Sequence, residues 1–405
     1  MKILIVNKFL YPNGGSETYI FKIGRQLQEM GHEVQYFGME HEGRIVGNRA
    51  ESYTSNLDFH TGKLQKFLYP LKIIYSAEAR KKIRRVLEDF DPDAVHLNNF
   101  NFQLTPSILY EIRKYEKRSG KRIRVIYTAH DSQLVCPNHL MQNPLTGERC
   151  TLCMESGAIN CVRGKCIHGS RIKSLLAALE HWIYRRLKTY RMIDRIICPS
   201  EFLKGRLATD PVLAPRLLVM HNFVDVKLPE REISKGDYAL YFGRYSEEKG
   251  IKTLLKAIGR FPEIPFVFAG NGPLRGEVEA AGNVENRGFL SGESLYETIS
   301  AARFSVFPSE CYENCPFSVM ESLLCRTPVI GANAGGVPEL IEAGRTGELF
   351  ECGDADQLAE RISSFWKEPG RLAEYTENCG KVKFDSLEEY CIKLCRIYRD
   401  ERNEG

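Results

Sequence analysis

The chain has 405 residues, of which 43% are hydrophobic and 27% charged, and its formal net charge is +4. This composition is typical of a folded globular protein and excludes a disordered or fibrous chain, while the length suits two α/β domains better than one core. No apolar run reaches the roughly 20 residues that span a bilayer, and the opening MKILIV lacks the basic start and longer apolar stretch of a signal peptide. We therefore expect a cytoplasmic protein.

The small net charge conceals an asymmetry along the chain. Residues 1–190 hold 29 Lys and Arg against 18 Asp and Glu, whereas the remainder holds 27 against 34. A basic first half favours an anionic partner, such as a membrane surface, a lipid diphosphate or a nucleic acid. A well-solvated basic surface is the alternative interpretation.

Short apolar runs alternate with helix-length amphipathic segments, a pattern that predicts βαβ units around a parallel sheet. The expected strands form a first set at residues 2–6, 32–38, 94–98, 124–131 and 195–200, and a second set at 238–245, 265–270, 304–309 and 327–331. Two sets predict two doubly wound domains joined by the polar connector 222–237. Because open parallel sheets bind ligands beyond the carboxyl ends of their strands, residues directly after strands are the candidates for function.

Two glycines follow the first expected strand. Gly14 and Gly15 stand in NKFLYPNGGSETYIF, ahead of an expected helix whose positive end favours phosphate. Glycine lets the backbone approach a ligand closely, although many loops of this kind hold two glycines for steric reasons alone.

Two basic stretches follow in the first half. Residues 63–85 mix Leu, Ile, Phe and Tyr with eight Lys and Arg, and residues 113–124 add a second basic run. On helices of the first domain they suit peripheral attachment to anionic lipid, although Pro70 argues against one long interfacial helix. A basic face in contact with solvent is the alternative.

Five of the thirteen cysteines fall between residues 136 and 166, in a strand-to-helix insertion at 136–168 with too few apolar residues to fold by itself. Two residues separate Cys150 from Cys153, a spacing that is typical of tetrahedral Zn²⁺ sites. A structural metal would supply the stability that the insertion lacks. The candidate ligands are Cys136, Cys150, Cys153, Cys161 and Cys166. Five thiols exceed four ligands, so spacing does not choose the set. Reduced cysteines without a ligand, and disulfide or redox chemistry, are the alternatives.

The second domain opens with a strand that leads into GRYSEEKGIKTLLKAI. Arg244 and Lys249 stand at the strand end and the helix start, where both could reach one diphosphate, Arg as a fork of donors and Lys as a compact charge. Gly270 and Gly272 follow the next strand, but the spacing to a third glycine is wrong for a dinucleotide fingerprint. This argues against a nicotinamide dehydrogenase.

The segment FSVFPSECYENCPFSVMESLLC holds two glutamates eight residues apart. Pro316 suits the first turn of a helix that starts near Phe317, which puts Glu313 in the preceding loop and Glu321 inside the helix. The amide groups of Phe317 and Ser318 then lie between two carboxylates, so the segment offers ligands for phosphate oxygens and for sugar hydroxyls.

Taken together, these motifs resemble the retaining GT-B glycosyltransferases of glycosyltransferase family four. FGRYSEEKG, AGNGP, the two glutamates and GGVPELI carry the resemblance in the second half, and YPNGGSE, DAVHLNN and YTAHD carry it in the first. The Cys-rich insertion after the His-Asp pair is similar to that of a subset of members. The resemblance implies an α/β GT-B fold, with two Rossmann-like doubly wound domains that face each other across a cleft. The implied parts are an acceptor-side domain at 1–221, the linker 222–237, a nucleotide-sugar-binding domain at 238–378 and a C-terminal helix at 379–405 that crosses back to the first domain.

The resemblance also implies a role for each matching residue. Arg244 and Lys249 are expected to bind the donor diphosphate, and Glu321 the ribose hydroxyls. Glu313 and His130 are expected to contact the transferred sugar. The remaining donor contacts are expected at Gly14, Gly15, Gly272, Leu290, Pro316, Phe317 and Ser318; Pro316 departs from the family because many members have glycine there.

The implied activity is the retaining transfer of a hexose-type sugar from a nucleoside-diphosphate sugar, with UDP favoured and GDP as the second option. The implied acceptor is a glycan or a lipid-linked molecule in cell-surface polysaccharide or glycoconjugate synthesis, with the inner face of the membrane as a peripheral location. No DxD-type run follows a strand, so protein cations are expected to replace a catalytic metal, and only the insertion is a candidate for structural zinc.

Three other functions fit parts of the sequence. A GT-B-like nucleotide-sugar epimerase would use the same donor site but no acceptor, and a non-catalytic nucleotide-sugar binding protein would keep the same ligand residues. A nucleic-acid binding protein could use the basic face, but the basic runs lack interleaved aromatic residues on which bases stack.

Overall fold

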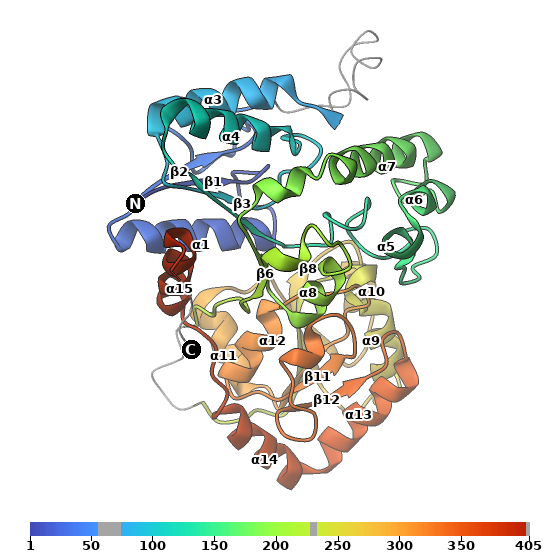
Figure 1. Cartoon of the computed structure of the whole chain (residues 1–405). Helices are drawn as coiled ribbons and strands as arrows, with labels where there is room; N and C mark the ends of the chain where they lie inside the picture. The colour runs from blue at the N-terminus through green and yellow to red at the C-terminus, as the bar shows by residue number, and fades with distance from the viewer. Residues whose placement is uncertain (56–73, 227–232, 402–405) are drawn as a thin grey trace. The chain divides into compact units, whose positions relative to one another are not determined.

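The computed structural model describes residues 1–55, 74–226 and 233–401, and the chain divides into two compact units. Unit 1 comprises Met1–Pro199, Leu203–Met220 and Leu387–Gly405, and unit 2 comprises Ser200–Phe202 and His221–Ser386. Each unit contains a six-stranded parallel sheet with helices packed against it (Figure 1). The prediction of two doubly wound α/β domains is confirmed.

The sheet of unit 1 has the strand order β2-β1-β3-β4-β5-β6. Its strands are β1 (Lys2–Val6), β2 (Glu33–Phe37), β3 (Ala94–Leu97), β4 (Arg124–Thr128), β5 (Arg195–Cys198) and β6 (Leu217–Val219). Its helices are α1 (Gly15–Glu29), α3 (Ala77–Phe90), α4 (Ser107–Ser119), α5 (Leu152–Ser156), α6 (Ile159–Arg163), α7 (Arg171–Arg186), η1 (Thr189–Met192), α8 (Glu201–Leu207), η2 (Ala214–Arg216) and α15 (Leu387–Arg399).

The core of unit 1 forms because its strands are apolar on both faces and its helices are apolar on one. Ile3 to Val6 of β1 are fully buried, and α1 turns Tyr19, Ile23 and Leu27 inward. The helices α3 and α4 lie on one face of the sheet, and α1 and α15 lie together on the other (Figure 1). The Tyr390 hydroxyl of α15 lies 2.9 Å from that of Tyr19, which ties the end of the chain to α1.

The sheet of unit 2 has the order β12-β11-β10-β7-β8-β9. Its strands are β7 (Ala239–Arg244), β8 (Phe266–Asn271), β9 (Val284–Gly288), β10 (Phe304–Phe307), β11 (Val329–Ala332) and β12 (Gly347–Phe350). Its helices are η3 (Glu247–Lys249), α9 (Ile251–Ile258), α10 (Arg275–Glu279), α11 (Gly292–Ala301), α12 (Phe317–Leu324), η4 (Val337–Glu339), α13 (Ala355–Lys367) and α14 (Pro369–Cys379). Counted within the unit, this is the order 3-2-1-4-5-6 of dinucleotide-binding folds.

Each sheet reverses its winding direction at one place, and ligands of such sheets bind beyond the strand ends there. In unit 1 the reversal lies between β1 and β3, and in unit 2 it lies between β7 and β10. The loops after these four strands are therefore the places to look for function. No helix in the described part of the chain is long and apolar enough to cross a membrane.

Candidate functional site

The loops after β7 and β10 are held together at the reversal point of unit 2. The Glu248 carbonyl oxygen, in the loop after β7, accepts hydrogen bonds from the amides of Glu310 (3.0 Å) and Cys311 (3.3 Å), in the loop after β10. Gly250 has a φ of +70°, and a Cβ atom there would lie 1.9 Å from the Pro308 carbonyl oxygen. The glycine is therefore required where the two loops approach each other.

This arrangement brings Lys249 to Glu313. The Lys249 ammonium pairs with Glu313 Oε1, and the two side chains are 32% and 19% exposed. Burial by itself would lower the pKa of Lys249, but the Glu313 carboxylate outweighs it and holds that pKa above its ordinary value. The Ser309 hydroxyl donates to the same Oε1 at 2.9 Å, which fixes the carboxylate. Lys249 is thus a charged, half-buried cation whose remaining N–H bonds can serve an anion.

Arg244 ends β7 and is exposed. Among the residues that the structure describes, its guanidinium forms no ion pair, although its charge helps to lower the pKa of Glu248, for which burial is the largest, opposing effect. The two predicted diphosphate ligands therefore stand on one short loop at the reversal point.

A second pair of glycines supports the loop that carries Glu313. The Gly336 amide donates to the Glu313 carbonyl oxygen at 2.7 Å. A Cβ atom at Gly335 would lie 2.1 Å from that oxygen, and one at Gly336 would lie 1.9 Å from the Asn314 carbonyl oxygen. These glycines of the GGVPELI motif thus position the Glu313 loop, a supporting role that the sequence did not reveal.

The helix α12 begins as predicted. Pro316 precedes it with an extended backbone (φ −69°, ψ 123°), and Phe317 and Ser318 form its first turn, whose amides point away from the helix without intrahelical acceptors. Glu321 is half-buried on the same helix, and its charge helps to raise the pKa of Tyr296 to about 12, although burial of that phenol is the larger cause.

The two other predicted residues of unit 2 have structural explanations. A Cβ atom at Gly272 would lie 2.4 Å from the Tyr245 carbonyl oxygen, so close packing already requires glycine there. Leu290 is half-buried against a core cluster that includes Leu240 and Val267. Neither observation tests a contact with the donor.

In unit 1 the loop after β1 surrounds a buried carboxylate. Glu17 of α1 accepts hydrogen bonds from Asn7 (2.8 Å) and Ser16 (2.9 Å). Gly14 has an extended backbone (φ −172°), and a Cβ atom at Gly15 would meet nothing within 4 Å. Packing within the chain therefore does not require glycine at either position, and a ligand contact of this pair stays a prediction.

His130 follows β4, beside the same reversal point. Its Nε2 lies 2.8 Å from Asn98 Oδ1, and its ring packs edge-on against Tyr19 at 5.0 Å. Burial lowers the pKa of His130 to about 4. The imidazole is therefore neutral at physiological pH. Because Asn98 uses its Nδ2 to donate to backbone oxygens, Oδ1 faces the ring and His130 donates through Nε2.

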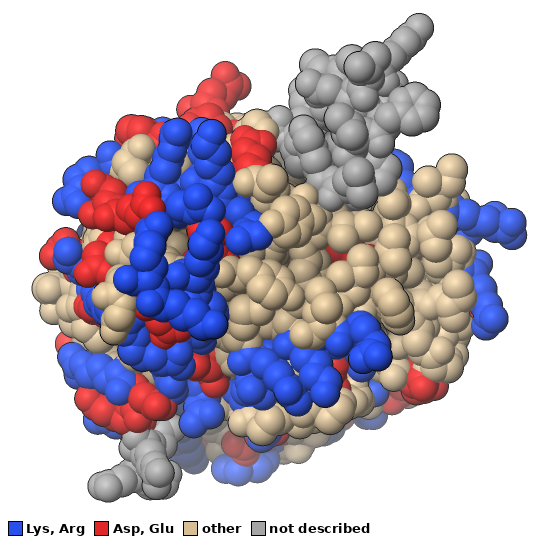
Figure 2. Space-filling view, turned by 45° about the horizontal axis from the view of Figure 1, so that its top comes forward, with Lys and Arg blue, Asp and Glu red and all other residues tan. Residues whose placement is uncertain are grey.

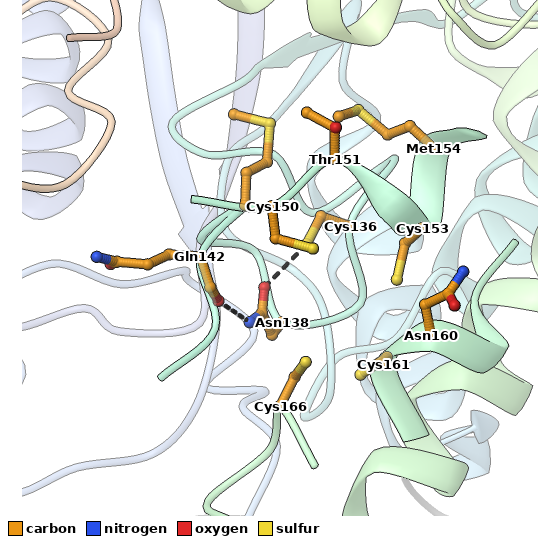
Figure 3. Close-up of a pocket in the computed structure, with 11 residues that line it drawn as sticks. Cys136, Asn138, Gln142, Cys150, Thr151, Cys153, Met154, Asn160, Cys161 and Cys166 are labelled. Atoms are coloured by element: carbon orange, nitrogen blue, oxygen red, sulfur yellow. Dashed lines mark hydrogen bonds between the residues drawn. The ribbon is translucent and has the colours of Figure 1, made fainter. Parts of the chain in front are cut away.

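The five predicted metal ligands lie together in unit 1 and line one cavity of about 20 Å³ (Figure 3). All five are free thiols. As the described side chains stand, no group of three or more His, Cys, Asp or Glu residues is arranged to hold a metal ion. The clustering was predicted, and a metal at the cavity stays a prediction.

Comparison with known proteins identifies the class that this fold and these loops define. A structure of HepE from Anabaena, in complex with UDP and glucose, superposes with a TM-score of 0.65 at 18% identity and covers 99% of this chain and all of the other. Two Rossmann-like domains with these strand orders form the GT-B fold, as predicted.

The family follows from the sequence models. Residues 13–228 match the model described as Glycosyltransferase Family 4, and residues 227–382 match that of Glycosyl transferases group 1. The chain belongs to Glycosyltransferase Family 4.

Two curated relatives illustrate the range of similarity. An uncharacterised glycosyltransferase of Methanocaldococcus jannaschii is 29% identical over 48% of this chain and 56% of its own length. The N-acetyl-alpha-D-glucosaminyl L-malate synthase of Bacillus anthracis is 22% identical over 94% of this chain and 91% of its own. The chain spans about half the length of the first curated relatives that it matches.

Proposed function

We propose that this protein is a retaining glycosyltransferase that moves a hexose-type sugar from a UDP-sugar, with GDP as the second option for the donor, to a glycan or lipid-linked acceptor. The observation that carries the proposal is the edge of unit 2, where Arg244, Lys249 and the first turn of α12 follow the two strands at the reversal point. Family membership and the UDP and glucose of the HepE complex support it.

The chemistry of the donor explains why cations are needed there. As the glycosidic bond to the nucleotide breaks, negative charge grows on the departing β-phosphate. Arg244 offers a fork of donors and Lys249 a compact charge, and the amides of Phe317 and Ser318 add the positive end of a helix. We propose that these groups neutralise the charge on the departing phosphate, as a metal ion does in metal-dependent glycosyltransferases.

The acidic residues suit the hydroxyl-rich part of the donor. We assign the ribose hydroxyls to Glu321 and the hydroxyls of the transferred sugar to Glu313. Lys249 now neutralises Glu313. When a diphosphate engages Lys249, the Glu313 carboxylate becomes a stronger acceptor for a sugar hydroxyl, so donor binding prepares the sugar contact.

His130 contributes a neutral imidazole and not a charge. Its pKa of about 4 leaves the ring uncharged, and because Nε2–H donates to Asn98, the ring can contact a hydroxyl of the sugar as an acceptor through Nδ1. We assign no side chain as a nucleophile, and we propose that the acceptor attacks the face from which the nucleotide leaves, as the retaining family implies. The Gly14–Gly15 loop is assigned to the diphosphate and the acceptor.

We propose that the acceptor is reached at an anionic membrane surface on the cytoplasmic side. The helix α7 carries Ile172, Leu175, Leu179 and Trp182 on one exposed stripe, each between 40% and 74% exposed. The spacing of three, four and three residues puts them on one side of the helix. Arg171 and Lys173 stand on either side of Ile172 at the start of the stripe, and Arg186 and Lys188 follow its end. The apolar stripe therefore has cations at both ends that complement anionic headgroups.

The α3–α4 region is a weaker candidate for membrane contact than the sequence suggested. Lys and Arg side chains gather on the side of these helices, beside a broad face with few charges (Figure 2). Two of them are used within the fold, because Arg80 and Arg84 both bind the buried Glu111 across the two helices. Residues 63–73 of the predicted basic stretch lie outside the described residues.

The activity is tested by a thermal-shift panel of nucleoside diphosphates and their sugars, followed by product analysis. A shift with UDP or GDP and transfer of sugar to a soluble or lipid-linked acceptor supports the proposal. Conversion of the donor alone into a new sugar isomer would make the protein an epimerase. A shift without any turnover on either type of acceptor would make it a binding protein.

Membrane binding is tested by co-sedimentation with vesicles of phosphatidylcholine, with and without phosphatidylglycerol. Substitution of Leu175 and Trp182 by serine should lower the partition coefficient at least about tenfold, because each large apolar side chain contributes about 1.5–3 kcal/mol on burial. The control is Ile392→Ser, which changes an exposed apolar residue of α15. Equal binding of both variants and the parent protein, or no preference for the anionic vesicles, would remove the proposed surface.

A further inference from the structure

The segment from Asn138 to Ser170 exposes several aliphatic side chains and buries thiols. It contains only the short helices α5 and α6, and the residues that it buries are Met141, Cys153 and Cys161. Four of its aliphatic side chains are at least half exposed instead: Leu140, Leu145, Leu152 and Ile159. A segment stabilised mainly by the hydrophobic effect would bury these three leucines and the isoleucine, which belong to the residue types most often found buried. Something other than apolar burial must therefore stabilise it.

Backbone strain strengthens this argument. His139, Met141, Lys165 and His168 all have positive φ angles, between 49° and 70°, although none is a glycine. Such residues cost free energy and persist only where the surroundings enforce them. Two helices of five residues and one bridge between Gln142 and Arg149 offer little enforcement.

The interior of the segment is a small cavity lined by sulfur. Five thiols border it, from the loop after β4 (Cys136), around α5 (Cys150, Cys153) and around α6 (Cys161, Cys166), and the sulfurs of Cys153, Cys161 and Cys166 face its middle (Figure 3). Its volume of about 20 Å³ is room for one ion or one water molecule. A water would find few partners, because the walls are mainly thiols and the thioethers of Met141 and Met154.

The five thiols border one cavity although they come from three separate stretches of the chain. Thiols gathered in this way can bind a divalent cation together once they lose their protons.

Cys136 is held at the edge of the cavity by a polar contact. Its thiol donates to Asn138 Oδ1 at 2.8 Å, and Asn138 donates through Nδ2 to the Gln142 carbonyl oxygen at 2.6 Å (Figure 3). Coordination of the Cys136 sulfur to a metal ion replaces the first of these hydrogen bonds.

We propose that Cys136, Cys153, Cys161 and Cys166 bind one structural Zn²⁺ in the cavity and that Cys150 stands at its rim. Four soft thiolates in a closed site are the donor set that zinc prefers. The thiols must turn toward a common centre for this, since their present arrangement is not that of a metal site. Each thiol releases its proton to solvent as its sulfur coordinates, so binding weakens as the pH falls.

The experiment measures metal, not activity, so its outcome is independent of glycosyl transfer. The full chain, purified without chelator under reducing conditions, should contain about one zinc per chain by elemental analysis. Release of that zinc by a thiol-modifying reagent should follow the loss of free thiols. Replacement by Co²⁺ should give the strong sulfur-to-metal absorption of a tetrahedral thiolate site.

Variants then assign the ligands. Cys153→Ser and Cys161→Ser should reduce the zinc content to about a tenth or less, whereas Cys150→Ser, the matched control from the same cavity, should retain it. If a ligand variant does not fold, the Co²⁺ spectrum of the parent protein still shows whether a tetrahedral thiolate site is present. Parent protein without stoichiometric metal, or with a disulfide among these five cysteines under non-reducing mass spectrometry, would overturn the proposal. Loss of zinc from Cys150→Ser would overturn the assignment of ligands.

Discussion

Replacement of Lys249 by alanine removes the cation that neutralises Glu313 and is assigned to the departing diphosphate. Loss of one preorganised donor of this kind typically costs about 2.7–4 kcal/mol of transition-state stabilisation, or about 10²–10³ in kcat. The structure adds a second effect. Glu313, only 19% exposed, loses its counter-ion and presents an uncompensated negative charge at the place where the diphosphate has to bind. We therefore expect kcat to fall by at least about a hundredfold and the affinity for UDP to fall as well.

The assay is steady-state turnover of the donor, with UDP binding measured separately by calorimetry. Lys252→Ala is the matched control, because Lys252 stands three residues further on and pairs with Glu247, and these side chains are 52% and 75% exposed. It should behave like the parent protein. Adding Glu313→Gln to Lys249→Ala should recover part of the lost UDP affinity, with a coupling energy of about 1 kcal/mol. Parent-like kcat and UDP affinity in Lys249→Ala would refute the reasoning.

Two further predictions concern the fold around the site. Gly250→Ala forces a side chain toward the Pro308 carbonyl oxygen at a φ of +70°, so it should lower the melting temperature and reduce the free energy of unfolding by at least about 1 kcal/mol. The control Gly276→Ala, whose added Cβ atom meets nothing within 4 Å, should not destabilise the protein. Equal melting temperatures of the two variants would contradict the packing of the two loops. Burial raises the pKa of Glu180 from 4.5 to about 8, so the folded state binds a proton at this carboxyl more tightly than the unfolded chain does. The stability that this bound proton contributes is lost as the pH rises from 4.5 to about 8. Glu180→Gln should therefore abolish part of the decline in denaturant midpoint between pH 5 and pH 8, and an unchanged pH profile would count against a buried neutral Glu180.

The central strands and the loops after them could be predicted from the sequence because parallel strands buried on both faces read as apolar runs. Three strands at sheet edges could not. β9 is VENRG with alternating exposed residues, β6 has three residues that are all only partly buried, and β12 is GELF with two partly buried residues in its middle. An edge strand is less completely covered by its neighbours than a central strand, so it needs fewer apolar residues. Its sequence therefore lacks the continuous apolar run that identifies a central strand.

The charged residues of the candidate site could be predicted from the sequence, but the contacts that support them could not. Arg244, Lys249 and Glu313 could be found because each follows a strand. The supporting contacts of Gly250, Gly335 and Ser309 could not, since they depend on how separate loops approach each other in the fold, as where Gly250 meets Pro308 and Ser309 meets Glu248. The apolar stripe of α7 was also missed. Its hydrophobic side chains look like those of a core helix, and only their exposure in the fold distinguishes them.

The most direct test of the account is a crystal structure of the full chain with UDP. The account predicts the diphosphate between Arg244, Lys249 and the amides of Phe317 and Ser318, with the ribose hydroxyls on Glu321. A nucleotide bound with its phosphates elsewhere, and with Lys249 still paired only to Glu313, would contradict it.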